Sequence, residues 1–228
     1  MGGGRRGSGD AGAPHRDSRG RAPFRAVRRR HAPAGGRGVS SLAFHDLTCV
    51  RGGRLLFEAL SFALEPGGAM LVTGPNGAGK SSLIRVAAGL LRPAAGWVEG
   101  DAACALLTEA ASLDEELPLA KALGFWARLD DRAGAVADAL GQLALADLAD
   151  VPVRLLSTGQ RRRAAFARVA ASGAPVWLLD EPANGLDGAA LGQLEAAIAH
   201  HRAGGGVVLV ASHSTIALPD AQVIELGI

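Results

Sequence analysis

Residues 74–82 read Gly-Pro-Asn-Gly-Ala-Gly-Lys-Ser-Ser and fill every fixed position of the pattern G-x-x-x-x-G-K-[ST]. An apolar run at 69–73 precedes them and an apolar-periodic stretch at 83–87 follows, which predicts a strand, a loop and a helix in that order. Glycines let such a loop curl until its N–H groups point into one concavity, and the helix adds its positive end. The pattern therefore predicts a polyphosphate-binding loop; a glycine-rich turn with a chance Lys-Ser is the weaker alternative.

The individual positions of this loop have separate predicted parts in binding. Lys80 is expected to reach the β- and γ-phosphates of a nucleotide, and the Ser81 hydroxyl is expected to coordinate Mg²⁺. The other predicted binding positions are Gly74, Pro75, Asn76, Gly77, Ala78, Gly79 and Ser82.

The charge of the 228-residue chain is unevenly distributed. Residues 1–38 contain ten Arg and two Asp, a charge of +8, whereas the whole chain carries only +2. This composition predicts a disordered Arg/Gly-rich tail over 1–39 and a folded domain over 40–228. Because the basic excess is confined to the tail, no nucleic-acid partner is expected. No apolar stretch reaches the roughly 18 residues that span a bilayer, so membrane association is expected only through a partner.

The hydrophobic pattern after Ser40 predicts an α/β fold. Two early segments alternate at the period of half-buried strands, and later helical segments alternate with fully apolar strands. Such strands form a mainly parallel sheet covered on both faces, here with an antiparallel β-subdomain and an inserted helical subdomain at about 115–172. The expected strands are 42–50, 60–64, 97–100, 102–107, 176–179, 207–210 and 223–224, and the later expected helices are 160–172 and 189–202.

Polar side chains follow two of the apolar strands directly. Asp180 and Glu181 come after the strand at 176–179, where open α/β sheets bind their ligands. Asp180 is expected to hold Mg²⁺ and Glu181 to polarise an attacking water, with an acidic helix cap as the alternative. His213 follows the next apolar strand and is expected to contact a γ-phosphate, with a structural histidine as the alternative.

Residues 156–160, Leu-Ser-Thr-Gly-Gln, begin a second helix whose N-terminus suits an anion. Ser157 can cap this helix, and Gly159 lets the backbone approach a phosphate. One subunit already served by residues 74–82 has no use for a second such site, so we expect it to face the nucleotide of a second copy. The arginines at 161–163 are interpreted as a solvated helix face rather than as phosphate ligands.

Together these motifs resemble those of the nucleotide-binding subunits of ABC transporters. The chain has, in order, the Walker A loop (74–82), the LSxGQ signature (156–160), Walker B (176–181), the D-loop (184–187) and the switch histidine, His213. The resemblance implies a P-loop NTPase fold of the ABC type and hydrolysis of ATP with Mg²⁺ by a pair of subunits. It implies catalytic roles for Lys80, Glu181 and His213, metal ligands at Ser81, Asp180 and Glu109, and nucleotide contacts from Arg51, Ser157, Gly159 and Asp187.

Two of these positions depart from the wider family pattern. Arg51 stands where an aromatic ring usually stacks on adenine; a guanidinium can also stack on a base. Glu109 stands where the glutamine of the Q-loop is expected. A carboxylate can still meet Mg²⁺ or water, so hydrolysis is expected, while coupling to a membrane partner is the property that this change affects.

A finer resemblance concerns residues 125–129, 155–163 and 177–182, which are similar to the ATP-binding subunits of bacterial haem exporters of cytochrome c biogenesis. It implies integral membrane permease partners that handle the haem, and a peripheral place on the cytoplasmic face of the inner membrane. The main alternative is the ATPase of another ABC exporter, for a drug, a lipid or another small molecule. A soluble ABC ATPase of DNA repair or translation is more remote, and a P-loop GTPase would need an N-K-x-D motif, which this sequence lacks.

Overall fold

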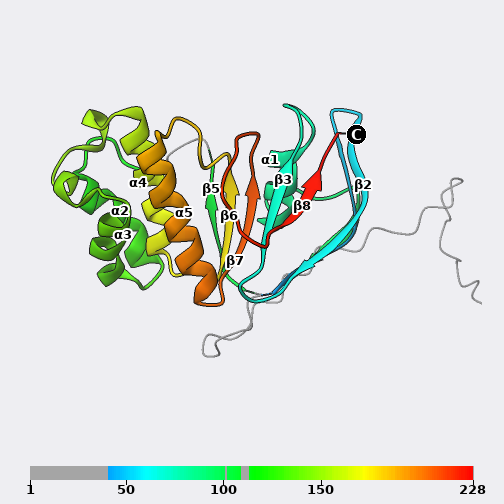
Figure 1. The fold of residues 1–228 in the computed structure, drawn as a ribbon, viewed down its shortest axis with the longest axis horizontal. Coiled ribbons are helices and arrows are strands. Elements are labelled where there is room, and N and C mark those ends of the chain that lie inside the picture. Colours follow the sequence, from blue (N-terminus) through cyan, green and yellow to red (C-terminus); the bar gives the residue numbers. More distant parts are fainter. Residues whose placement is uncertain (1–40, 101, 109–112, 228) are drawn as a thin grey trace, which may run out of the picture.

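The computed structural model describes residues 41–100, 102–108 and 113–227 (Figure 1). The predicted disordered tail at 1–39 and the predicted metal ligand Glu109 lie outside the described residues.

A five-stranded parallel sheet forms the centre of the fold. Its strand order is β5-β6-β7-β3-β8, and all neighbouring strands run parallel. Every residue of β6 and β7 is buried, as their continuous apolar sequences require of strands covered on both faces. The predicted α/β class with a mainly parallel sheet is therefore confirmed. The strands are β3 (Ala69–Thr73), β5 (Cys104–Leu107), β6 (Val176–Asp180), β7 (Val207–Ala211) and β8 (Gln222–Glu225).

A separate antiparallel sheet of order β2-β1-β4 comes from β1 (Leu42–Arg51), β2 (Arg54–Leu64) and β4 (Ala95–Glu99). Strand β2 begins six residues before the predicted strand at 60–64, so that prediction was too short. Asp46 and Ala59 have left-handed backbones, and the register between β1 and β2 shifts near them. Such irregularities interrupt the alternation by which a strand is recognised in a sequence.

Five α-helices complete the described parts of the chain. They are α1 (Lys80–Ala87), α2 (Leu119–Leu129), α3 (Val136–Gln142), α4 (Thr158–Ala171) and α5 (Gly188–Ala203). Helices α2, α3 and α4 group on the side of the parallel sheet away from β1 and β2 (Figure 1). They fall within the expected helical subdomain, whose limits remain a prediction. Within the described ranges, no helix combines the length and apolarity that a membrane crossing needs.

Alternate residues of the parallel strands supply two separate cores. Trp177 and Leu179 of β6 pack into a core with residues of α2–α5. Val176 and Leu178, on the opposite face, pack with residues of α1 and the antiparallel sheet. The sheet is thus packed between a helical layer and a mixed layer, and both cores lie on its faces rather than at the ends of its strands.

His201, near the end of α5, stacks on Trp177 under the helical layer. The two rings are 3.9 Å apart between centroids and nearly parallel, at 7°. Burial of the imidazole lowers the pKa of His201 from 6.5 to about 4. The folded protein therefore holds this ring neutral at pH values where an unfolded chain would protonate it.

We predict that this difference destabilises the protein in mild acid. Because the unfolded state takes up the proton near pH 6.5 and the folded state only near pH 4, stability is full above 6.5 and falls as the pH drops toward 4. The loss is on the order of 2–3 kcal/mol. Urea unfolding between pH 4 and 8 measures it, and His201→Phe should flatten the profile. His200→Gln, at the exposed neighbouring position, is the control and should keep most of the profile, because the charge of His200 is the smallest of the causes that act on the His201 pKa.

Candidate functional site

The strand order brings three loops together at the carboxyl edge of the parallel sheet. Strand β7 lies between β6 and β3, so the segments that follow these three strands are neighbours. They carry the glycine-rich loop after β3, Asp180 and Glu181 at the end of β6, and His213 after β7. This edge is where open α/β sheets bind their ligands.

The loop after β3 has the backbone that its glycines were expected to allow. Gly74, Gly77 and Gly79 have φ angles of 131°, 81° and 112°, in the left-handed region that favours glycine. A Cβ at Gly74 would overlap the carbonyl oxygen of Leu226, which follows β8. The shape of the loop is therefore set by its own backbone and by Leu226, which packs against it.

Lys80 is buried inside the curl of this loop, with only 6% of its side chain exposed. Its Nζ donates hydrogen bonds to the carbonyl oxygens of Gly74, at 2.8 Å, and Pro75, at 3.3 Å. The same Nζ lies 3.8 Å from Oε1 of Glu181. The ammonium group is thus placed between the loop and the acidic pair, in reach of any phosphate held there.

Ser81 and Asp180 meet across the gap between α1 and β6. The Ser81 hydroxyl donates to Oδ1 of Asp180 at 2.9 Å. Burial raises the pKa of Asp180, with Glu181 adding to the shift, while the bond from Ser81 opposes it. A hydroxyl and a carboxylate oxygen side by side are ligands that Mg²⁺ prefers, and this ion usually takes one or two carboxylates plus phosphate oxygens. The pair therefore fits a nucleotide-bound Mg²⁺, whose charge would offset the cost of burying Asp180.

Glu181 is held by both its backbone and its side chain. Its φ of 49° is left-handed, a conformation that costs a non-glycine residue on the order of 1 kcal/mol. The Glu181 N–H donates to the carbonyl of Ala211 at 2.8 Å. Its Oε2 accepts from the N–H of His213 at 3.2 Å and lies 2.8 Å from that residue's Nδ1. His213, predicted to contact a γ-phosphate, is therefore paired with Glu181 in this structure and half exposed.

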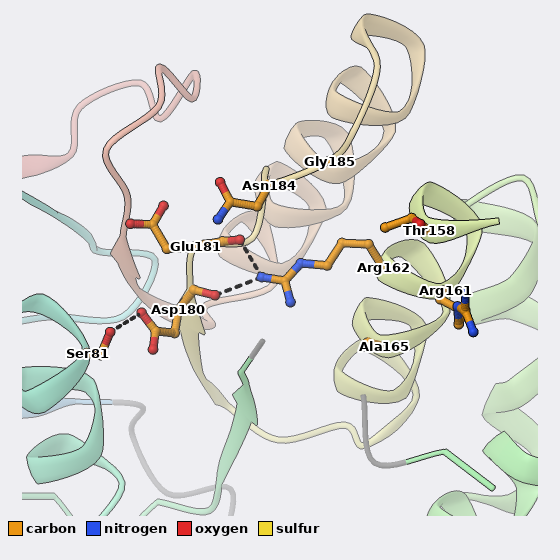
Figure 2. Close-up of a pocket in the computed structure, with 9 residues that line it drawn as sticks. All are labelled: Ser81, Thr158, Arg161, Arg162, Ala165, Asp180, Glu181, Asn184 and Gly185. Atoms are coloured by element: carbon orange, nitrogen blue, oxygen red, sulfur yellow. Dashed lines mark hydrogen bonds between the residues drawn. The ribbon is translucent and has the colours of Figure 1, made fainter. Parts of the chain in front are cut away.

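The helix α4 begins at the predicted second anion site. Ser157 accepts a hydrogen bond from the N–H of Gln160, whose side chain in turn accepts from the N–H of Ser157, so the two form a capping box. Thr158, in the first turn, and Ser81 lie on opposite sides of a pocket in Figure 2. The exposed start of α4 is thus separated from the chain's own loop at 74–82.

The pocket between them has a volume of about 390 Å³. Its walls come from α4, the end of β6 and the turn that follows it (Figure 2). In that turn Asp187 caps α5 by accepting from the N–H of Ala190 at 2.8 Å, and the carbonyl of Gly185 lies against Gly159. The predicted nucleotide contacts Gly159 and Asp187 therefore flank one side of this pocket, and their proposed roles concern a second copy.

Arg51 lies at the exposed end of β1, opposite Arg54 across the β1–β2 hairpin. The same hairpin approaches the phosphate loop, since a Cβ at Gly79 would lie 3.0 Å from the Leu56 Cβ and 3.3 Å from the Phe57 ring. This proximity suits a contact between Arg51 and a nucleobase, which remains a prediction. The predicted ligand Glu109 is not among the described residues.

The arginines at the start of α4 do not form a solvated face, so that interpretation was wrong for two of the three. Arg162 donates to the carbonyls of Thr108, Asp180 and Glu181. Arg163 donates to the carbonyls of Leu143 and Ala144 and to the side chain of Gln193. Both guanidinium groups therefore donate to backbone carbonyls of neighbouring elements instead of facing solvent.

A family model described as ABC transporter matches residues 57–184, more than half of the chain. The chain belongs to the ABC transporter family. The solved structure of an ABC transporter ATP-binding protein from Pyrococcus furiosus has the same fold, with a TM-score of 0.73 at 22% identity over 82% of this chain and 98% of that one. The family and the fold predicted from the motifs are therefore confirmed.

Two curated relatives define the position of this ABC protein more finely. Both are cytochrome c biogenesis ATP-binding export proteins named CcmA. The one from Sphingopyxis alaskensis is 62% identical over 82% of this chain and 97% of its own length. The one from Zymomonas mobilis is 51% identical over 83% of this chain and 86% of its own length. The finer resemblance to ATP-binding subunits of cytochrome c biogenesis is thereby confirmed.

We predict that two of the three loop glycines of this ABC protein differ in their tolerance of a side chain. Gly74→Ala should destabilise the nucleotide-free protein severely, since its Cβ would overlap Leu226 in addition to the left-handed backbone. Gly77→Ala is the matched control, because a Cβ at Gly77 has no atom within 4 Å. It should lower the free energy of unfolding only by the cost of a left-handed backbone, about 1–2 kcal/mol. Thermal unfolding without nucleotide measures both. Equal losses would show that Leu226 does not constrain the loop.

Proposed function

We propose that the protein is the ATP-hydrolysing subunit of a bacterial ABC export complex that serves cytochrome c biogenesis, with haem as the exported group. The observation that carries the chemistry is Glu181, held between Lys80 and His213 and directly after Asp180. The names of the relatives support the assignment to cytochrome c biogenesis.

Binding of ATP would begin with a change of partners at Lys80. The ammonium would leave the carbonyls of Gly74 and Pro75 for the β- and γ-phosphates, while the N–H groups of the loop and of the first turn of α1 point at the same oxygens. Ser81 and Asp180 would hold Mg²⁺, which supplies neutralisation of phosphate charge. In this structure Nζ of Lys80 already lies 3.8 Å from Oε1 of Glu181, and the Ser81 hydroxyl already contacts Asp180.

Hydrolysis requires a water placed in line with the γ-phosphorus. Glu181 would accept a hydrogen bond from this water, whose oxygen attacks the phosphorus as the bond to the bridging oxygen of ADP breaks. His213 holds Oε2 of Glu181 and would also contact the γ-phosphate. Because phosphoryl transfer depends on positioning and electrostatics, small shifts of these groups decide the rate.

A second copy of the chain would complete each site. The capped start of α4 is exposed and lies across the pocket from Ser81, so Ser157 and Gly159 are free to approach the nucleotide of a partner. Asp187, at the start of α5, would lie at the same junction. Closing the pair over two ATP molecules then brings the parts of each site together.

The proposed complex includes integral membrane permease subunits that handle the haem. The chain would sit as a peripheral subunit on the cytoplasmic face of the bacterial inner membrane. Another ABC exporter, for a drug or a lipid, would use the same catalytic residues and differ only in the permease.

We predict that Glu181→Gln binds ATP, forms an ATP-dependent dimer and hydrolyses at least about a hundredfold more slowly. The amide keeps the shape of the side chain but cannot accept the proton that the attacking water loses. Size-exclusion chromatography with ATP and a phosphate-release assay measure both effects. The control is Glu99→Gln on the exposed face of β4, which should behave as the unmodified protein. Turnover of Glu181→Gln at the unmodified rate would remove Glu181 from its proposed role.

Purification of the protein from detergent-solubilised membranes should recover integral subunits of a cytochrome c biogenesis exporter. Any tag belongs before residue 40, because Leu226 and Gly227 pack against the phosphate loop. Mass spectrometry identifies the recovered subunits, and cells without the tagged protein provide the background. Recovery of a drug or lipid permease instead would overturn the haem assignment and leave the ATPase assignment intact.

A further inference from the structure

Arg162 connects three elements that meet behind the catalytic pair. It projects from the first turns of α4, and its Nη1 donates to the carbonyl of Thr108, at the end of β5, at 2.8 Å. Its Nη2 donates to the carbonyl of Asp180 at 2.8 Å and also to that of Glu181. Figure 2 shows the extended side chain crossing from α4 to these two carbonyls.

The bond to Glu181 acts on a strained residue. Glu181 has a left-handed backbone, which a side chain with a Cβ adopts only when its surroundings hold it there. Its N–H donates to the carbonyl of Ala211, and its carbonyl accepts from Arg162 and, at 3.3 Å, from the N–H of Asn184. These bonds together set the backbone from which the carboxylate reaches Lys80 and His213, and the one from Arg162 is the one that comes from another element.

We propose that Arg162 is a positioning residue for hydrolysis. Its guanidinium group fixes the backbone of Glu181 and links that backbone to α4 of the same chain. Its hydrogen bonds go to the backbone carbonyls of Asp180 and Glu181, so its proposed effect on turnover comes through the placement of this pair. The inference rests on the proposed ATP hydrolysis, because turnover is what reports the placement of Glu181.

The hydrogen bonds of Arg162 also connect parts of two different nucleotide sites in the proposed pair. Residue 162 stands four positions after Thr158, so the end of α4 that would approach the partner's nucleotide is bonded to the backbone of Glu181, whose carboxylate would serve the chain's own nucleotide. A planar guanidinium can donate to carbonyls on two strands at once, whereas the single ammonium of a lysine cannot reproduce this fork. Arg162→Lys therefore keeps the positive charge and removes the geometry.

The test compares Arg162→Lys with Arg168→Lys in the full chain. Arg168 is on the same helix and also donates to a carbonyl of β5, that of Leu106, but does not contact the catalytic pair. Turnover is measured with Mg-ATP and normalised to the number of ATP-binding sites in each preparation. For Arg162→Lys we expect kcat to fall at least about tenfold, as displacement of a catalytic group does, with KM and the Kd for ATP within threefold. Arg168→Lys should lower the melting temperature while keeping kcat within threefold.

A second measurement separates positioning from general support of the fold. In a protein that already carries Glu181→Gln, the further change Arg162→Lys should leave the residual turnover within twofold, because the carboxylate whose placement depends on Arg162 has been removed. An undiminished kcat for Arg162→Lys, a further drop in the Glu181→Gln protein, or loss of all ATP binding would each overturn the proposal. If the unmodified protein hydrolyses no ATP, the proposed function fails instead.

Discussion

The hydrogen bond from Ser81 to Asp180 exists because of the strand order β6-β7-β3. These residues are 99 positions apart, and the parallel arrangement of β3 and β6, with β7 between them, brings the ends of both strands to one edge. The same order places His213, after the middle strand, beside Glu181. Every part of the site within one chain follows from this arrangement, and the two cores on either face of the sheet keep it rigid.

Much of this arrangement could be predicted from the sequence because its signals are local. The glycine spacing in residues 74–82 predicts the backbone conformation of the loop, and the apolar strand before Asp180 indicates a sheet edge. The start of β2 was missed because Ala59, with its left-handed backbone, and the register shifts against β1 interrupt the alternation. Those interruptions depend on how two strands pair, which no single stretch of sequence states.

The arginines of α4 show a second limit of sequence reasoning. Strand β5 is an edge strand, so the carbonyls along its outer side have no neighbouring strand to bond. Arg168 and Arg162 donate to two of them, those of Leu106 and Thr108. In the sequence Arg162 is indistinguishable from Arg161 beside it, because the decisive partners lie 54 and 18 residues away. Which arginine is solvated and which is anchored is a tertiary property.

The contact between Gly74 and Leu226 bears on how the protein is made. Strand β8 pairs with β3, and the N–H of Leu226 donates to the carbonyl of Thr73 at 2.9 Å, a contact that closes about 150 residues of chain. Contacts of such long range form late, and a ribosome adds Leu226 only about 150 residues after Thr73. The phosphate loop therefore lacks one of its walls while the preceding strands are already assembling, and it is completed only when β8 joins the sheet.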